Sequence, residues 1–258
     1  MKISIVTPVL NGARFIRKTI ESVLSQKGDF EIEYIIKDGG STDQTLAILD
    51  EFQQCPSLHV IPQKDDGLYD AINQGFKHAT GDIGCWINAD DYYEPGAFQT
   101  VVDAFQTHPD QQWLFGDCDI VNASSKEIRK FITWYKGVLA ALGSYHILTC
   151  ENYVNQPACF WRMRLWQCVG GLDATYKYAA DYALWLNMAT CAGMPMRIQH
   201  TLAHFRRCGD SLSDTQFTQQ FQEELYIAKQ FCCPMAYAIH RFNTFKIISV
   251  YKLLNFLA

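Results

Sequence analysis

Aspartates in this 258-residue chain gather directly after short apolar segments. Asp38 follows the segment 32–36, Asp65 and Asp66 follow 58–62, and Asp90 and Asp91 follow 83–87. A solitary loop acid is usually a solvated turn residue or a helix cap. Adjacent carboxylates at the end of an apolar strand instead raise one another's pKa, and a divalent cation relieves that repulsion. One or two carboxylates suit Mg²⁺ or Mn²⁺ that also binds phosphates, so the pattern predicts a metal-dependent site for a phosphorylated substrate.

A parallel sheet would bring these acids to one edge, and the first half of the chain has the alternation that such a sheet needs. Strands are expected at 3–6, 32–36, 58–62 and 83–87, and helices between them at 13–26, 44–53 and 69–80. Consecutive strands separated by helices form a parallel sheet that binds ligands beyond its carboxyl ends. The sequence therefore predicts an α/β fold with a mostly parallel, Rossmann-like central sheet flanked by helices.

The second half is less regular. A helix at 96–108 and a strand at 113–121 precede a stretch at 132–145 rich in Trp, Tyr and Gly, whose loops are expected to shape a pocket for a second substrate. Six aromatic residues either form a platform for a ligand or belong to the core: Trp134, Tyr135, Tyr145, Tyr153, Phe160 and Trp161. A helix at 181–191 and a strand at 196–204 are expected to complete the compact part.

The chain is expected to be helical from residue 217, and residues 242–258 are apolar nearly all round, with Lys246 and Lys252 as their charges. Such a helix either packs on the domain or lies on a membrane surface. The N-terminus lacks the pattern of a secretion signal, and no apolar run is long enough to span a bilayer. These features predict a cytoplasmic protein, with peripheral contact to the inner face of the plasma membrane as one alternative.

Composition excludes several classes of function. A net charge of -5 argues against broad capture of nucleic acid. The ten cysteines form no CxxC pair, and most are expected to be small core residues. His200, His204 and Cys208 would share a face only on a helix, whereas their segment alternates like a strand. The sequence also lacks the glycine motifs of dinucleotide-binding proteins, P-loop proteins and serine hydrolases.

Four motifs, in this order, resemble those of family 2 glycosyltransferases of the GT-A fold. They are TPVLNG (7–12), DGGSTDQT (38–45), DDGLYDAINQGFKHATGD (65–82) and INADDYYEPGA (87–97). The third and fourth are similar to the bacterial polysaccharide and O-antigen branch of that family. The resemblance implies a GT-A domain over 1–215, with a nucleotide-sugar half at 1–121 and an acceptor half at 122–215, followed by a C-terminal helical extension at 216–258.

The resemblance also implies roles for single residues. Thr7, Pro8, Val9 and Asp38 match positions that hold the uracil and ribose of a nucleotide sugar. Asn88, Ala89 and Asp90 stand where the family has its D-x-D metal motif, so Asp90 is the expected metal ligand. Asn88 replaces the first carboxylate, and Asp91 is a second candidate ligand. Asp181 matches the acid that serves as catalytic base, whereas the Glu that precedes it in the family is Ala180 here.

Other predicted substrate-binding residues lie within these motifs or later in the chain: Asn11, Asp66, Gly67, Asn73, Gln156 and Arg206. Gln156 is expected to bind a sugar, and Arg206 to reach the pyrophosphate. The ligand on the aromatic platform would be the acceptor sugar. The alternative for Asp181 is a helix N-cap.

The chemistry is consistent with these groups. A metal at Asp90 would stabilise the departing diphosphate, and Asp181 would deprotonate the attacking hydroxyl, which predicts inversion at the anomeric carbon. We therefore expect a Mn²⁺- or Mg²⁺-dependent enzyme that transfers a hexose from a UDP-sugar to a saccharide or lipid-linked acceptor in surface polysaccharide biosynthesis.

Two alternatives stay open. A sugar nucleotidyltransferase would carry a glycine- and lysine-rich phosphate loop, which TPVLNGARF does not offer. A non-catalytic binding protein is suggested by Asn88 and Ala180 alone.

Overall fold

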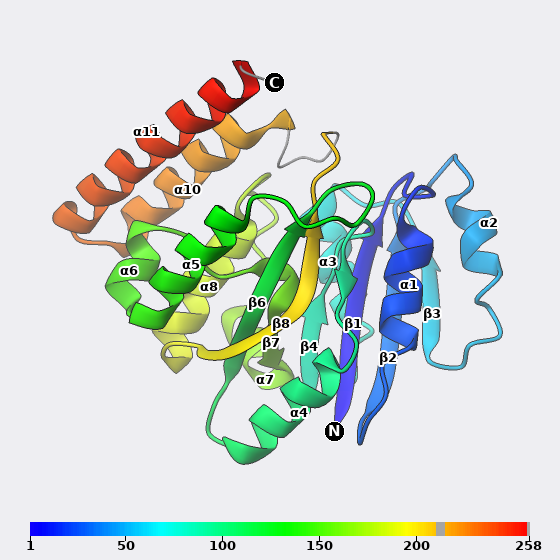
Figure 1. The fold of residues 1–258 in the computed structure, drawn as a ribbon. Helices are drawn as coiled ribbons and strands as arrows, with labels where there is room; N and C mark the ends of the chain where they lie inside the picture. Colours follow the sequence, from blue (N-terminus) through cyan, green and yellow to red (C-terminus); the bar gives the residue numbers. More distant parts are fainter. Residues whose placement is uncertain (210–214, 257–258) are drawn as a thin grey trace.

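A single eight-stranded sheet forms the centre of the computed structural model, which describes residues 1–209 and 215–256 and their side chains as far as residue 249 (Figure 1). The strand order is β3-β2-β1-β4-β7-β6-β8-β5. The strands are β1 (Lys2–Val9), β2 (Glu31–Asp38), β3 (Leu58–Pro62), β4 (Ile83–Trp86), β5 (Tyr92–Tyr93), β6 (Trp113–Val121), β7 (Cys159–Arg162) and β8 (Met196–Arg206).

The first four strands are parallel, as the sequence predicts, and β6 is parallel to β8. The two groups are joined by β7, which runs antiparallel to both β4 and β6. A short antiparallel strand, β5, closes the edge beside β8. The strands predicted at Leu58–Pro62 and Trp113–Val121 have the predicted bounds.

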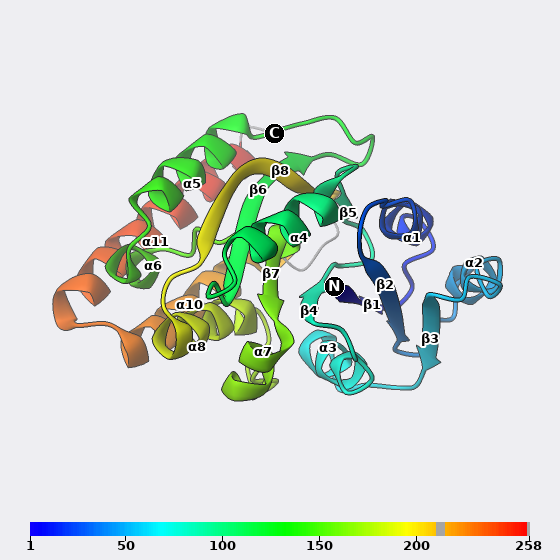
Figure 2. The same ribbon diagram turned by 90° about the horizontal axis from the view of Figure 1, so that it is seen from below.

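Helices cover both faces of the sheet. One layer contains α1 (Ile16–Leu24), α2 (Thr45–Asp50) and α4 (Ala97–Thr107); the other contains α3 (Leu68–Phe76), α7 (Met163–Val169) and α8 (Ala180–Ala192) (Figure 2). Successive residues of β1 point to opposite layers, since Ile3 and Ile5 pack in the first and Val6 in the second. This double burial explains why the strands read as continuous apolar runs.

The prediction of pocket-forming loops at 132–145 is wrong, because most of this segment lies in α5 (Lys130–Leu142), which is followed by α6 (Tyr145–Cys150). Phe131, Trp134, Val138 and Leu142 recur at helical spacing and lie on the exposed side of α5. These apolar residues thus follow a helical period, which the Trp and Gly content of the segment obscures in the sequence.

The predicted C-terminal helical extension is confirmed as α10 (Phe217–Phe231) and α11 (Pro234–Phe256). α11 packs on α6, where His240 Nδ1 lies 2.9 Å from the carbonyl oxygen of Thr149 and Asn243 binds the carbonyl of Cys150. Its other side exposes Met235, Ile239, Phe242 and Phe245. Residues 257 and 258 of the predicted membrane contact lie outside the described residues. Among helices in the described part of the chain, none has the length and apolar composition that crossing a bilayer requires.

Candidate active site

The parallel strands end at Val9, Asp38, Pro62 and Trp86, and we call this side of the sheet the carboxyl edge. Val9 and Asp38 are paired in the register of β1 and β2. The Asp38 carboxylate is 1% exposed and accepts hydrogen bonds from the main-chain N–H groups of Gly40, at 2.9 Å, and Ser41, at 3.1 Å. The loop after β2 therefore wraps around the acid that is predicted to bind ribose.

Asn11 connects the loops that follow β1 and β2. Its φ of 55° lies in the left-handed region, which Asn tolerates better than most residues. The Asn11 Oδ1 atom accepts hydrogen bonds from the N–H groups of Thr42, at 2.8 Å, and Asp43, at 3.3 Å. Pro8 and Val9 are buried, and the Thr7 hydroxyl lies 3.0 Å from that of Tyr34. Asn11 and the Thr7 side chain thus support the loops through bonds within the protein.

Lys37 of β2 forms an ion pair with Asp65, which follows β3, and the sequence does not single out this pair. The Lys37 ammonium is fully buried and lies 3.2 Å from Asp65, with the carbonyl of Gln63 as a further acceptor. Asp66 is exposed, and Gly67 is the N-cap of α3, with a φ of 122°, a backbone conformation that favours glycine.

Asn73 has both ends of its amide engaged. Its Nδ2 group donates to the carbonyl of Leu172 at 2.8 Å, and its Oδ1 atom accepts from the N–H of Leu172 at 3.0 Å. This pair joins α3 to the loop before α8. The structure places Asn73 in a structural contact between two elements of the predicted site.

The predicted metal motif follows β4, and its two acids have different surroundings. Asp90 is half-buried, whereas Asp91 is 0% exposed. The Asp91 carboxylate accepts hydrogen bonds from the Arg206 main-chain N–H, at 2.7 Å, and from the Asn88 amide, at 3.3 Å. Burial, followed by the charge of Asp90, raises the pKa of Asp91 well above its ordinary value. Asp90 is therefore the more accessible of the two predicted ligands.

Arg206 lies next to these acids but is buried, at 1% exposed. Its Nε–H donates to the Asp90 carbonyl at 2.8 Å, and one terminal nitrogen donates to the carbonyls of Asn122 and Ala123. The guanidinium also lies over the Phe15 ring, 4.6 Å from its centroid. The structure thus gives Arg206 a part in fixing the loop around Asp90, a role that the sequence does not indicate.

The residues after β4 offer oxygen atoms to a hard cation. The Asn88 Oδ1 atom is buried and has no hydrogen-bond partner within the protein. The Ala89 carbonyl accepts from the Thr19 hydroxyl at 2.9 Å, which fixes the turn between Asn88 and Asp90. In the described part of the chain, no three His, Cys, Asp or Glu side chains form a metal-binding group. Two carboxylates and an unpartnered amide oxygen fit a Mg²⁺ or Mn²⁺ ion that completes its coordination with phosphate oxygens and water.

Gln156 lies beside this motif, in a 3-10 turn (Gln156–Ala158) before β7. Its Nε2 group donates to the Trp86 carbonyl at 2.9 Å, and its Oε1 atom lies 3.5 Å from the Asn88 amide nitrogen. The turn therefore brings a predicted sugar-binding residue next to the predicted metal motif, although the two are far apart in the sequence.

Asp181 lies in the first turn of α8. Ala179 is the N-cap of this helix, which corrects the alternative that Asp181 is the cap. The Asp181 carboxylate is half-buried and accepts from the Tyr182 N–H at 2.8 Å. Desolvation raises its pKa to about 6, against a smaller lowering by that hydrogen bond and by the charge of Lys136. A carboxyl group with this pKa is suited to general-base catalysis near neutral pH.

Tyr69 connects Asp181 to the carboxyl edge. It lies in α3, directly after the loop Asp65–Gly67, and is 8% exposed. Burial, and then the charge of Asp181, raises the pKa of the Tyr69 phenol well above its ordinary value. The start of α8 is thus near the start of α3, which brings the predicted base to the same edge as the predicted donor-binding loops.

Half of the predicted aromatic platform belongs to the core. Tyr153, Phe160 and Trp161 are at most 1% exposed, whereas Trp134 is 62% exposed. Tyr135 is half-buried, and its hydroxyl donates to Glu151 at 3.1 Å. The exposed Trp134 and the half-buried Tyr135 and Tyr145 are the members of the set that an acceptor can reach.

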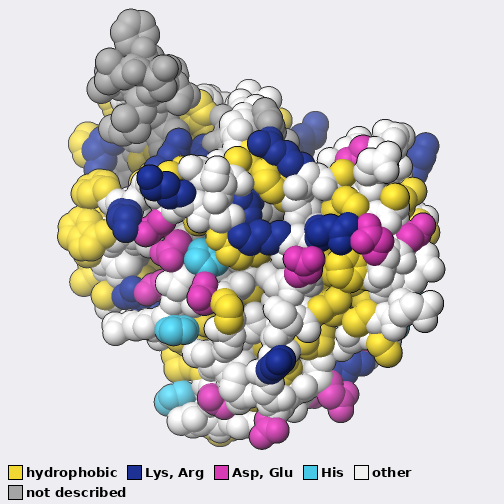
Figure 3. Space-filling model, turned by 45° about the vertical axis from the view of Figure 1, so that its right-hand side comes forward, with side chains coloured by type: hydrophobic (Ala, Val, Ile, Leu, Met, Phe, Trp, Pro, Cys, Tyr) yellow, Lys and Arg dark blue, Asp and Glu magenta, His cyan; other side chains and the backbone are white. Residues whose placement is uncertain are grey.

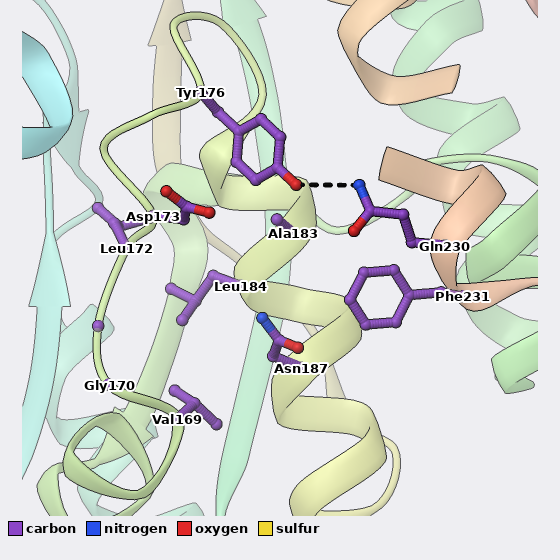
Figure 4. A pocket seen from close by; sticks show the side chains of 11 residues that line it. Val169, Gly170, Leu172, Asp173, Tyr176, Ala183, Leu184, Asn187, Gln230 and Phe231 are labelled. Atoms are coloured by element: carbon purple, nitrogen blue, oxygen red, sulfur yellow. Dashed lines mark hydrogen bonds between the residues drawn. The ribbon is translucent and has the colours of Figure 1, made fainter. Parts of the chain in front are cut away.

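A cavity of about 340 Å³ lies between α8, the loop 169–176 and the end of α10 (Figure 4). Asn187 and Leu184 of α8 line it, and the Tyr176 hydroxyl accepts from Gln230 Nε2 at 3.2 Å across it. None of the predicted site residues lines this cavity. It is distinct from the site at the carboxyl edge.

A sequence model described as Glycosyl transferase family 2 matches residues 4–164. An uncharacterised glycosyltransferase of Nostoc sp. is 36% identical over 211 residues, which cover 80% of this chain and 65% of that protein. A PGL/p-HBAD biosynthesis glycosyltransferase of Mycobacterium bovis is 30% identical over 227 residues, covering 86% of this chain and 83% of that protein. The chain thus spans about two thirds of the first relative and most of the second.

Solved glycosyltransferases share the fold. Staphylococcus aureus TarS 1-349 in complex with UDP-GlcNAc superposes with a TM-score of 0.67 at 18% identity, covering 88% of this chain and 66% of that one. The mannosyltransferase PcManGT of Pyrobaculum calidifontis, in complex with GDP-Man and Mn²⁺, gives a TM-score of 0.70 at 15% identity, covering 94% and 69%. At these identities the likeness shows the GT-A fold alone.

Proposed function

Because the chain belongs to glycosyl transferase family 2, we propose that it transfers a hexose from a nucleotide-sugar, with UDP as the carrier, to a saccharide or lipid-linked saccharide acceptor. One observation carries the proposal: Asp181, a carboxyl group with a pKa raised to about 6, lies beside the start of α3 at the carboxyl edge. A base at this place can accept the proton of a hydroxyl that attacks a sugar bound beyond the strands.

The proposed donor site follows β1, β2 and β3. Thr7, Pro8, Val9 and Asn11 would hold the base through the loop after β1, and Asp38 would accept hydrogen bonds from the ribose. Asp66 and Gly67, at the exposed start of α3, would approach the sugar or diphosphate. Asn73 would contribute indirectly, because its two hydrogen bonds with Leu172 hold the loop before α8 against α3. A donor of this class is supported by the complexes of TarS with UDP-GlcNAc and of PcManGT with GDP-Man. These complexes do not fix the base or the sugar of the donor.

The proposed metal site consists of Asp90 and the oxygen atoms beside it. Bound Mn²⁺ or Mg²⁺ would stabilise the negative charge of the departing nucleoside diphosphate. Asp90 is the accessible ligand, Ala89 sets the turn, and Asn88 offers its unpartnered amide oxygen. Asp91 would become a ligand only by exchanging its hydrogen bond with Asn88 for the ion. Arg206 would hold the Asp90 backbone in place.

Asp181 is the proposed catalytic base. Its ionised carboxylate would take the acceptor proton while the acceptor oxygen attacks the anomeric carbon and the diphosphate leaves from the opposite face. A single displacement of this kind inverts the anomeric configuration. Gln156 would orient the acceptor or the sugar next to Asn88.

We also propose that α11 brings the enzyme to a membrane that carries lipid-linked acceptors, on its cytoplasmic face. Residues 234–256 contain Arg241, Lys246 and Lys252 but no Asp or Glu, so the charge of the helix complements an anionic lipid surface. Phe242 and Phe245 are 63% and 71% exposed on this helix. Figure 3 shows hydrophobic side chains, with Lys and Arg side chains near them, at the left-hand edge of the face drawn. An amphipathic helix with these properties binds in the plane of the bilayer interface.

Vesicle binding tests this part of the proposal. Sedimentation with vesicles of phosphatidylglycerol and phosphatidylcholine should recover the wild-type protein, and the double variant Phe242→Ser/Phe245→Ser should stay in the supernatant. Leu10→Ser, which changes an exposed apolar residue far from α11, serves as the control. Equal sedimentation of the double variant and the wild type would contradict membrane docking through α11.

A donor screen tests the transfer reaction. Wild-type protein is incubated with UDP-, GDP- and dTDP-sugars and Mn²⁺ or Mg²⁺, and the released nucleoside diphosphate is measured. Asp181→Asn should retain donor binding and lose most turnover, whereas Asp103→Asn, at an exposed acid on α4, should behave as wild type. Binding without turnover in the wild-type protein would favour the non-catalytic alternative. Release of pyrophosphate from a nucleoside triphosphate and a sugar phosphate would favour a nucleotidyltransferase.

A further inference from the structure

Glu223 of α10 binds the chain immediately before α8. Its Oε2 atom accepts hydrogen bonds from the main-chain N–H groups of Tyr178, at 2.6 Å, and Ala179, at 2.7 Å. Its Oε1 atom accepts from the N–H of Lys177 at 2.9 Å. One carboxylate thus binds three consecutive amides that lie 44 to 46 residues away in the sequence.

These bonds hold the chain that enters α8, a helix with no side-chain cap of its own. The N-cap residue is Ala179, whose side chain cannot accept a hydrogen bond. The first N–H groups of a helix have no partner within it, and the positive end of its dipole favours an anion. Glu223 accepts a hydrogen bond from one of these N–H groups, that of Ala179, and brings a negative charge from another helix to this end of α8.

The amides that Glu223 holds are next to the proposed base. Ala179 and Asp181 are separated by Ala180, which occupies the position of the family's Glu. The direction of the Asp181 side chain depends on the first turn of α8, and Glu223 fixes the chain that enters this turn. The charge of Glu223 also acts on the Asp181 carboxyl group directly.

The neighbouring residue on α10 extends this contact. Glu224 is 5% exposed and receives a hydrogen bond from Gln220 at 3.4 Å. Burial, followed by the charge of Asp181, raises the pKa of Glu224 to about 8. Glu224 is therefore mainly protonated at neutral pH and adds little negative charge beside the base.

We propose that Glu223 is a positioning residue for Asp181, so that the C-terminal helix α10 is an integral part of the active site. This inference rests on the proposed function, in which Asp181 is the base. Glu223 acts through the main chain of residues 177–179. Loss of its carboxylate should impair the proton-accepting step and leave donor binding intact.

The variants Glu223→Gln and Glu223→Ala test the proposal on the full-length protein. Glu223→Gln keeps the size of the side chain and one acceptor oxygen but places an NH₂ group against an N–H donor. Gln222→Ala, at an exposed neighbouring position on α10, is the matched control. Because a misplacement of about 1 Å costs on the order of 100-fold in rate, kcat should fall roughly 10- to 100-fold in both variants. The KM for the UDP-sugar should change less than about twofold, since donor contacts are made elsewhere.

Hydrogen exchange provides a readout that does not depend on turnover. The amides of residues 177–179 should exchange faster in both Glu223 variants than in the wild type and in Gln222→Ala. Comparable exchange in all four proteins would overturn the proposed clamp even in the absence of an assay for transfer. A thermal melt of each variant establishes that the variant is folded under the conditions of the exchange measurement.

The pH profile distinguishes positioning from general loss of structure. Asp181 is surrounded by Tyr182 on its own helix, Lys136 on α5, Glu223 and Glu224 on α10, Tyr69 on α3 and Cys159 on β7. Glu223 raises the pKa of Asp181, so its neutralisation in Glu223→Gln should move the acid limb of kcat to lower pH while the plateau falls. A plateau and an acid limb both equal to those of the wild type would overturn the proposal. An inactive wild-type protein would instead refute the proposed function.

Discussion

The pH dependence of turnover follows from the surroundings of Asp181. Desolvation raises the pKa of this carboxyl group from an ordinary 3.8 to about 6. Only the ionised form can accept the acceptor's proton, so kcat should fall as pH decreases through the pKa. At about pH 5, roughly one tenth of the molecules would carry an ionised group with a pKa of about 6, whereas more than about nine tenths would at the ordinary pKa.

Lys136 provides the perturbation that tests this origin. Its positive charge lowers the pKa of Asp181, so Lys136→Met should raise that pKa and move the acid limb of kcat to higher pH. Lys130→Met removes a charge from the same helix at an exposed position, paired with Glu127, and should leave the profile unchanged.

The assay is nucleoside diphosphate release at saturating donor between about pH 4.5 and about pH 8. A wild-type plateau that extends down to about pH 5 would show that the essential base has an ordinary carboxyl pKa. That result would refute the assignment of catalysis to the desolvated Asp181. If Lys136→Met does not move the acid limb of kcat, the inferred effect of the Lys136 charge on the pKa of Asp181 is refuted.

Three further predictions concern stability and metal binding. Asp181→Asn should stabilise the protein by about 2 kcal/mol above pH 6, because the elevated pKa in the folded state makes ionisation of Asp181 unfavourable there. This gain in stability should vanish below the pKa that Asp181 has in the unfolded state. Denaturant titrations at two pH values measure the gain. Arg206→Met should lower the free energy of unfolding by about 3 kcal/mol, since it leaves the carbonyls of Asp90, Asn122 and Ala123 without this hydrogen-bond donor. Calorimetry should then show a fall in Tm of roughly 5 to 10 °C. Asp90→Ala should weaken UDP binding at least about tenfold in the presence of Mn²⁺ and have little effect with EDTA, as measured by titration calorimetry; equal losses under both conditions would contradict a metal role.

The parallel half of the sheet could be predicted from sequence because each strand is a short apolar run that is buried on both faces. The motif loops at its carboxyl ends were located for the same reason, since Asp38 and Asp90 directly follow such runs. The antiparallel insertion of β7 between β4 and β6 was not predicted, because strand order depends on contacts between distant segments.

Other features depend on packing that a linear pattern does not contain. The exposed apolar stripe of α5 was obscured by Trp134 and Gly137, and a pocket-forming loop was expected there. Arg206 was predicted to reach a pyrophosphate, but its place in the structure is set by backbone carbonyls on other loops. Glu223 gave no local signal, because it binds the main chain ahead of a helix that ends more than 30 residues earlier in the sequence.

The anomeric configuration of the first product tests the central claim most directly. Proton NMR can follow hydrolysis of an α-linked UDP-hexose from the start of the reaction, with water in place of the acceptor, and compare wild type with Asp181→Asn. A single displacement assisted by Asp181 predicts that the β-hexose appears first, before mutarotation, and that the variant forms it far more slowly. Initial release of the α-hexose, or undiminished release by Asp181→Asn, would contradict the account.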